Sequence, residues 1–490
     1  MTIIINQNLD QYPEMTPAIN LLPPELLSEI LQQVVKGAKA HRDQHVRYLS
    51  HVDQHWRSVA LDTPQLWTTI VSKTPFDSIY DFERIAVWSE RAKAVSLIFV
   101  LRDVEKDAAK ALVDIFKLIG PTVETILFEP GHYWPLYRIL DGTPATLSFP
   151  RLQRLASNGT LSLAVIRKHF LGAIPSLNQL SLVLHDLRGI EMVKDLWPWL
   201  TTFHGSFLDE QTLSGLFANA PRLRECSFAT KIGALQIQPS LRHDALRSLF
   251  VRGYSTPTEG FSTHFPSLPN LEHLGIYTPI EDGRISHPFI SRLFHSCCAT
   301  LRYLELFVYD MDITEFTRLL TLAPLIRFLH LSGGVAEGFI KALTFHSESN
   351  PILPELEVIS LSEIRFTQGP LWELAVSRAR VPLADHQSDL PISSSYIMPD
   401  IASTVHIWNP PLRRALRYII MSEKGLTHKH RSRFGFTRVS MQNELGISLE
   451  ITGSAHHLPR KDAMELLKLS LYEAPKWDWK ERVDIWQPTW

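Results

Sequence analysis

Histidines and glycines supply the most obvious candidates for chemistry in this sequence. The pairs His428-x-His430 and His456-His457 carry imidazole nitrogens that could ligate a metal, but no Cys or carboxylate stands at ligand spacing beside them. The segment Ser332-Gly333-Gly334 lacks the spacing of a phosphate-binding loop. Because 21 histidines in 490 residues produce such pairs by chance, we interpret both pairs as surface loops and the glycine segment as a turn.

The chain also contains one basic cluster, and it contains no catalytic signature. The cluster comprises Arg413, Arg414, Arg417, Lys424, Lys429, Arg431 and Arg433. Such a cluster could meet phosphate or an acidic partner, but no aromatic residues interleave with it, which favours a solvated face. Neither a G-x-S-x-G elbow nor an H-E-x-x-H helix is present. We expect no enzyme, no cofactor and no metal, and keep an enzyme with an unrecognised site as an alternative.

Composition points to a soluble chain of two or three domains. The 490 residues are 45% hydrophobic and 20% charged, and the net charge of -2 gives no global reason to expect nucleic-acid or membrane binding. Three cysteines are too few for a disulfide framework, which indicates a reducing compartment. The start of the chain lacks the basic region of a signal peptide, and no apolar run approaches eighteen residues. We therefore expect cytoplasmic and/or nuclear localisation.

The elements that would position a functional surface begin in the segment from Leu22 to Ile70. Leu22, Leu26, Ile30 and Val34 stand four residues apart, which predicts a helix with one apolar face. The adjacent prolines before Glu25 suit the first turn of that helix.

A second apolar pattern follows this helix. It runs from Val46 to Val59 and should end near Thr63, because the residue before Pro64 is pushed out of the helical region. Short helices in about fifty residues bury only part of so many apolar side chains among themselves, so the excess indicates a partner.

In these residues the sequence resembles an F-box. The matching positions are Leu22, Pro23, Glu25, Leu26, Ile30, Leu31, Leu49, Val52, Trp56, Arg57, Ala60, Thr63, Pro64, Leu66 and Trp67. The ending from Thr63 to Trp67 is similar to the form found in F-box proteins abundant in mushroom-forming fungi. Asp53 stands where that family often has a small residue.

The F-box resemblance implies docking onto the adaptor subunit of a cullin–RING (SCF-type) ubiquitin ligase. By position, the adaptor-binding residues would be Leu22, Pro23, Leu26, Ile30, Leu31, Val52 and Trp56. The alternative is an ordinary helical cap whose apolar faces pack on the next domain.

A repeat occupies the middle of the chain. The pattern apolar-x-x-apolar-x-apolar begins at Leu177, Leu223, Leu246, Leu271, Leu301, Ile326 and Leu356, and weaker copies begin at Val123, Leu152 and Leu200. Consecutive starts among these ten are 23 to 30 residues apart. A proline stands two residues before eight of these starts. Since proline ends helices and favours extended geometry, each unit can end a helix and begin a strand there.

Amphipathic segments separate the predicted strands. Helices are expected near 79–88, 161–171 and 288–296, with Asp209 and Thr314 as caps of two others. One strand and one helix in every 23 to 30 residues resembles an irregular leucine-rich repeat, in which stacked neighbours seal the core. The fold class expected is α/β, a leucine-rich-repeat solenoid with a curved parallel sheet and helices on its convex face. An α/β domain with short parallel strands is the alternative.

The resemblance weakens after about residue 364. Residues 383–404 are rich in Ser and Pro, which is typical of a linker. Alternating apolar residues from Leu445 to Ile451 predict one half-buried strand, paired with 434–439. Four tryptophans, Trp477, Trp479, Trp486 and Trp490, close the chain. We interpret them as a cap over the last repeat, with partner binding as the alternative.

These features together predict six regions. They are a tail at 1–20, an F-box helical module at 21–70, a linker helix and first strand at 71–120, the solenoid at 121–370, a linker at 371–404 and a capping region at 405–490. The resemblances imply a substrate-recognition subunit that binds the adaptor, and through it a cullin, with one end and an unidentified target protein with the other. A repeat scaffold without ligase association is the alternative. Candidate target contacts on the exposed strand face are Asn178, Arg224, Glu272, Arg302, Arg327 and Glu357.

Overall fold

The computed structural model divides into two compact units, Met1–Leu200 and Thr201–Trp490. It describes residues 22–37, 42–72, 78–101, 109–128, 147–157, 176–183, 190–206, 210–231, 241–254, 266–277, 287–308, 311–344, 352–362, 368–378, 416–422 and 448–452. The 1–20 tail, the 383–404 linker and the Trp-rich end lie outside these residues. In the part of the chain that is described, no helix combines the length and apolar character that crossing a bilayer requires.

The first unit opens with a small helical module. Helix α1 spans Pro24–Gly37, α2 spans Arg42–Leu49, α3 spans Gln54–Leu61, and the 3-10 turn η2 spans Pro64–Trp67. The pattern from Val46 to Val59 thus forms two helices and not one. Asp53 breaks it, because its backbone is extended (φ -157°) and its carboxylate accepts a hydrogen bond from the N–H of Trp56 at 2.8 Å.

The remainder of the first unit is a parallel sheet whose strands follow chain order. The strands are β1 (Thr69–Val71), β2 (Leu97–Leu101), β3 (Val123–Phe128), β4 (Arg154–Ser157) and β5 (Gln179–Val183). Helices α4 (Ser78–Ala92) and α5 (Ala109–Ile119) and the 3-10 segment η5 (Ile190–Trp199) complete it. The sheet begins earlier than predicted, because β1 precedes the expected first strand and lies inside the expected module.

The second unit continues the same architecture. Its strands are β6 (Thr202–Ser206), β7 (Glu225–Lys231), β8 (Ser248–Tyr254), β9 (His273–Tyr277), β10 (Tyr303–Phe307), β11 (Phe328–Ser332), β12 (Val358–Leu361), β13 (Tyr418–Ser422) and β14 (Ser448–Thr452). Within this unit, consecutive strands from β6 to β14 pair with one another in parallel. A doubly wound domain would reverse its strand order at some point. Strict chain order in each unit instead identifies an α/β repeat solenoid, as predicted.

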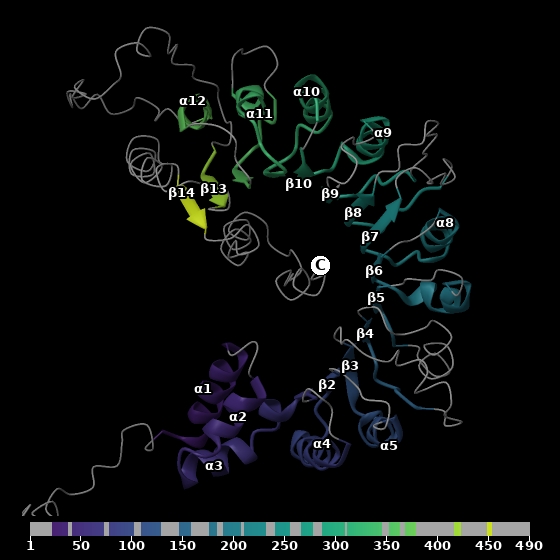
Figure 1. Cartoon of the computed structure of the whole chain (residues 1–490), viewed down its shortest axis with the longest axis vertical. Helices are drawn as coiled ribbons and strands as arrows, with labels where there is room; N and C mark the ends of the chain where they lie inside the picture. The colour runs from purple at the N-terminus through teal and green to yellow at the C-terminus, as the bar shows by residue number, and fades with distance from the viewer. Residues whose placement is uncertain are drawn as a thin grey trace, which may run out of the picture. The chain divides into compact units, whose positions relative to one another are not determined.

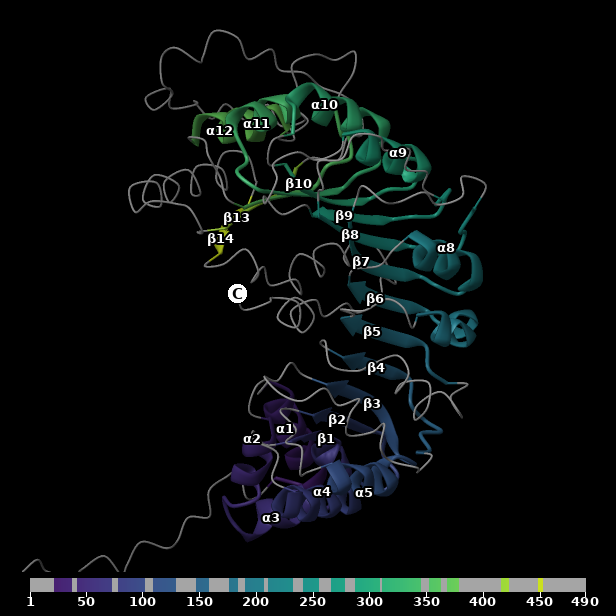
Figure 2. The ribbon, with the colours of Figure 1, turned by 45° about the vertical axis from the view of Figure 1, so that its right-hand side comes forward.

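Helices cover one face of the second unit's sheet. They are α8 (Glu210–Asn219), α9 (His287–Cys297), α10 (Ile313–Leu322), α11 (Glu337–Leu343) and α12 (Gln368–Arg378). Figure 1 places them on the outer side of the strand arc, and Figure 2 shows α9 to α12 side by side. The predicted helix at 288–296 is confirmed as α9, whereas 161–171 and Asp209 lie outside the described residues.

The repeat core is built from the predicted apolar positions. All ten pattern starts are fully buried; Val123 opens β3, and each of the other nine stands two residues before its strand. The stack extends beyond the predicted end at residue 370, because α12 enters the expected linker and β13 and β14 continue the parallel sheet. The predicted strand near Ile451 is confirmed as β14, but its partner is β13; residues 434–439 lie outside the described part.

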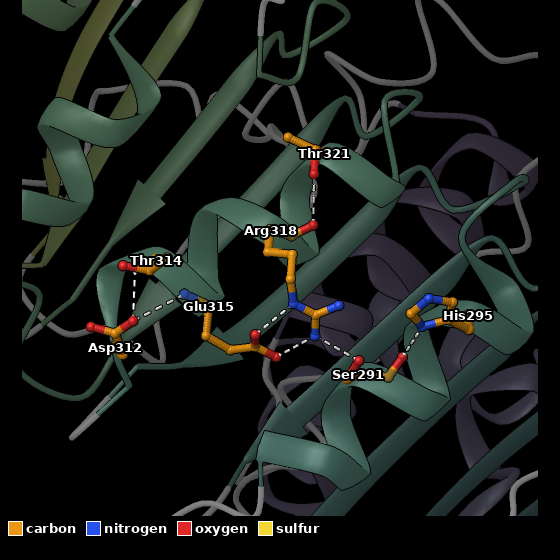
Figure 3. Close-up of polar contacts among 7 residues, drawn as sticks. All are labelled: Ser291, His295, Asp312, Thr314, Glu315, Arg318 and Thr321. Atoms are coloured by element: carbon orange, nitrogen blue, oxygen red, sulfur yellow. Dashed lines mark hydrogen bonds and ion pairs between the residues drawn. The ribbon is translucent and has the colours of Figure 1, made fainter.

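Neighbouring repeats are joined by polar contacts on the helix layer (Figure 3). Arg318 on α10 donates to both carboxylate oxygens of Glu315, at 2.7 and 2.6 Å, and to Ser291 Oγ on α9 at 2.6 Å. Asp312 caps α10 by accepting from the N–H groups of Thr314 and Glu315, so the predicted cap at Thr314 is wrong by two residues.

Candidate partner-binding surfaces

The interior of the helical module is filled by its own side chains. Leu27, Leu31 and Val35 on α1 are buried, as are Val59, Ala60, Leu66 and Trp67 on the following elements. The indole N–H of Trp67 donates to the Ala60 carbonyl at 2.8 Å, which satisfies the one polar atom of that buried ring. The apolar residues left on the surface are therefore not needed to complete this core.

The adjoining side of α1, about 100° around the helix from these buried residues, exposes a line of apolar side chains. Leu26, Ile30 and Val34 follow one another at four-residue spacing and are 50%, 39% and 43% exposed, and we call them the module strip. Tyr48 on α2 and Val52 after it are more exposed still. Of the ten exposed large apolar side chains found in the described residues, five lie between 26 and 52, so the excess of apolar surface is concentrated in the module.

The predicted adaptor-binding residues fall into different environments. Pro23, Leu26, Ile30 and Val52 are exposed, and Leu22 and Trp56 are half-buried. Leu31 is fully buried and faces the module interior, where it supports α1 without reaching the strip. The helical spacing of the sequence also contains Val34, which the family pattern leaves out, whereas no pattern identifies the exposed Tyr48.

Trp67 attaches the module to the first helix of the repeats. Its ring lies 5.1 Å from that of Trp88 on α4 in an edge-to-face arrangement, and the Arg91 guanidinium lies 4.4 Å over it. Burial first, and the positive charge of Arg57 second, lower the pKa of Arg91. Arg84 Nη2 donates to the Val71 carbonyl of β1 at 2.6 Å. These contacts fix module, α4 and sheet as one body within the first unit.

A second candidate surface is an aromatic face on β9 to β11. Strand residues that alternate with the buried leucines carry rings there: His273 lies 5.5 Å from Tyr303, which stacks on Phe328 at 4.4 Å, and Tyr277 lies 4.9 Å from Phe307. The parallel register places these rings in two rows across neighbouring strands. His273, Tyr277 and Tyr303 are half-buried, whereas Phe307 and Phe328 are buried and support them from within the stack. Large rigid rings that are partly accessible are typical anchors of protein interfaces.

The charged residues predicted on the exposed strand face occupy two different environments. Arg224, Glu272 and Arg302 stand directly before their strands, and Arg224 and Arg302 are exposed. Arg327 and Glu357 are buried and form an ion pair, with Nε to Oε1 at 3.0 Å. These two are therefore not on an exposed face, because each satisfies the charge of the other inside the stack.

Side chains that could bind a metal ion do not cluster in the described part of the chain. The described residues contain no group of three or more His, Cys, Asp or Glu side chains that could hold a metal ion. His330 on β11 lies with Nδ1 2.8 Å from Ser360 Oγ and with Nε2 3.3 Å from Ser362 Oγ. These contacts join β11 to the end of β12. The predicted histidine pairs at 428–430 and 456–457 lie outside the described residues, as does most of the basic cluster.

Comparison with known proteins gives little information about function. No protein-family model and no curated protein matches the chain. Among solved structures, the chain is similar to one from the crystal structure of a Rad7 and Elc1 complex in yeast, with 13% identity and a TM-score of 0.36, covering 70% of this chain and 89% of that one. A likeness at this level carries no argument about function.

Proposed function

We propose that the chain is the substrate-recognition subunit of an SCF-type ubiquitin ligase. The observation that carries the proposal is the module strip: a complete small helical module exposes Leu26, Ile30 and Val34 in the segment whose sequence resembles an F-box. Burial of such a strip on a partner is worth roughly 25 cal/mol for each Å² of apolar surface removed from water. The partner would be the ligase adaptor, and through it a cullin.

The chain would perform no bond chemistry in this role. Its module holds the ligase while the repeats hold the target protein, so the contribution to rate is proximity of the target to the ubiquitin-charged enzyme. The Trp67 contacts support this role, because a module fixed to α4 and β1 transmits its position to the first repeats. A ligase of this kind would act in the cytosol or nucleus.

Coexpression with the adaptor of the same organism tests the proposal. Leu26→Asp places an unpaired carboxylate in the proposed interface, and we expect it to cost about 2 kcal/mol or more of binding, which is roughly thirtyfold in affinity. Pull-down and size-exclusion chromatography measure the complex. Leu118→Asp on α5 is the matched control, because Leu118 is 44% exposed and lies outside the module.

Two outcomes separate the proposal from its alternative. Adaptor that copurifies with the wild type and with Leu118→Asp, but not with folded Leu26→Asp, supports the ligase role. Soluble wild-type protein that binds no adaptor would leave a repeat scaffold that binds partners without a ligase.

A further inference from the structure

The residues directly before the strands of the second unit form a continuous backbone ladder. The N–H of Arg247 donates to the carbonyl of Arg224 at 2.8 Å, Glu272 to Arg247 at 2.9 Å, and Arg302 to Glu272 at 2.9 Å. The ladder continues through Arg327 and Glu357 to Arg417, each bond 2.8 Å long. Equivalent side chains are thereby placed in one row across neighbouring strands, about 4.8 Å apart.

This row is strongly basic although the whole chain is not. Read along the ladder, its residues are Arg, Arg, Glu, Arg, Arg, Glu and Arg, five positive charges against two negative ones in a chain of net charge -2. Like charges on directly paired positions destabilise a sheet. A neighbouring pair such as Arg224 and Arg247 therefore needs a compensating charge from elsewhere.

One arginine of the ladder, Arg327, has its positive charge neutralised by a neighbouring carboxylate. Arg327 is buried and donates through Nε and Nη2 to Glu357 Oε1, so its charge is neutralised within the stack. Arg224 and Arg302 are exposed, and the described residues offer neither of them a side-chain hydrogen bond or ion pair. Arg247 Nη1 donates a hydrogen bond to the Asn270 carbonyl oxygen at 3.0 Å. We call Arg224, Arg247 and Arg302 the arginine row.

Nearby acidic groups are already engaged or too few. Asp244 pairs with Arg242 at 2.7 Å, and Glu225 accepts from Thr202 Oγ1 at 3.2 Å. Of the two carboxylates in the ladder, Glu357 is paired with Arg327, and Glu272 lies between Arg247 and Arg302.

We propose that the arginine row binds an extended acidic segment of a protein partner. Three strand spacings separate Arg224 from Arg302, about 14 Å, which roughly four residues of extended chain span. Carboxylates suit guanidinium groups, because the planar fork donates two parallel hydrogen bonds. Glu272 requires a neutral or basic residue opposite it, so the segment carries two acidic groups with a gap between them. A nucleic-acid strand, charged at every step, fits that interruption less well.

The inference extends the proposed function by naming the class of target, but its test does not use the adaptor. Fluorescence anisotropy measures binding of a labelled Glu-Glu-Ser-Ser-Glu-Glu peptide to the full chain at low salt. We expect affinity that falls as NaCl rises and a glutamine version of the peptide that does not bind. Arg224→Gln with Arg302→Gln should weaken binding about tenfold, since an exposed ion pair is worth up to about fivefold.

A matched double variant controls for net charge. Arg57→Gln with Arg154→Gln removes two exposed arginines of the first unit and should change affinity by less than about twofold. Unchanged melting temperatures would show that both variants are folded. Equal losses in the two variants, or no binding by the wild type, would overturn the proposal. So would a single-stranded oligonucleotide that outcompetes the peptide, which would assign the row to nucleic acid. Adaptor binding in the earlier experiment is independent of each outcome.

Discussion

Asp53 shows how one residue can alter a motif without removing its surface. Its carboxylate caps α3 through the Trp56 N–H, and its extended backbone separates α2 from α3. A small apolar residue at this position could not accept that bond. The departure from the F-box pattern therefore has a local structural role, and the apolar residues of α1 remain exposed beside it.

Removing this cap should loosen α3 selectively. Asp53→Ala loses the side-chain acceptor, and we expect a cost of about 1 kcal/mol, seen as roughly fivefold faster amide exchange in Gln54–Leu61. Hydrogen–deuterium exchange of that peptide measures the effect. Asp53→Ser keeps a capping oxygen and should exchange nearly as the wild type does. If the alanine and serine variants exchanged alike, the hydrogen bond would not be what stabilises α3.

At the scale of elements, periodicity predicts the strands well because each repeat is a local pattern. Each of the ten predicted starts is followed within two residues by a strand or opens one, and their leucines, valine and isoleucine are buried. The pattern contains no information on pairing between distant segments, so it does not identify β13 as the partner of β14. It also does not distinguish an exposed charge from a compensated one, as Arg327 and Glu357 demonstrate. The helical spacing of Leu26, Ile30 and Val34 predicts that they share one face, whereas no repeating pattern near Tyr48 predicts its exposure.

Another element owes its position to a buried cation. Arg378 at the end of α12 donates to three backbone carbonyls, those of Leu343 at 2.8 Å, Leu353 at 2.9 Å and Ile352 at 2.6 Å. Burial lowers the pKa of Arg378 to about 9, which still leaves it protonated at neutral pH. The side chain thus joins the end of α11, the turn before β12 and α12.

Loss of that guanidinium should be costly. Arg378→Met leaves three carbonyls without their donor, and we expect roughly 3–5 kcal/mol of destabilisation, measured by urea denaturation followed by circular dichroism. Arg378→Lys keeps the charge but lacks the planar fork, so an intermediate loss is expected. A methionine variant as stable as the wild type would mean that the three contacts contribute nothing net.

At the scale of the whole molecule, the division into two compact units predicts that destabilising one unit leaves the other folded. Cys226 and Cys297 are buried in the second unit, and burial raises the pKa of both thiols, so they report whether that unit is intact. Stability in repeat proteins is approximately a sum over neighbouring units, which allows one part to open while another stays folded.

Leu31→Asp tests this separation. A buried unpaired carboxylate at a position with 0% exposure should unfold the module, whereas Leu26→Asp on the exposed strip should not. In a Cys298→Ser background, thiol labelling of Cys226 and Cys297 should stay as slow as in the wild type while amides of Pro24–Gly37 exchange rapidly. Fast labelling of both thiols would show that the two units unfold together.

The backbone ladder before the strands also affects how the partner specificity of such a chain can evolve. Its hydrogen bonds join main-chain atoms only, so the exposed side chains of Arg224 and Arg302 are not needed to form it. Substituting an exposed rung such as Arg224 or Arg302 leaves the ladder intact and alters only the charge presented there. A duplicated copy of this chain could therefore acquire a different partner by a few substitutions in one row, with no need for a new fold.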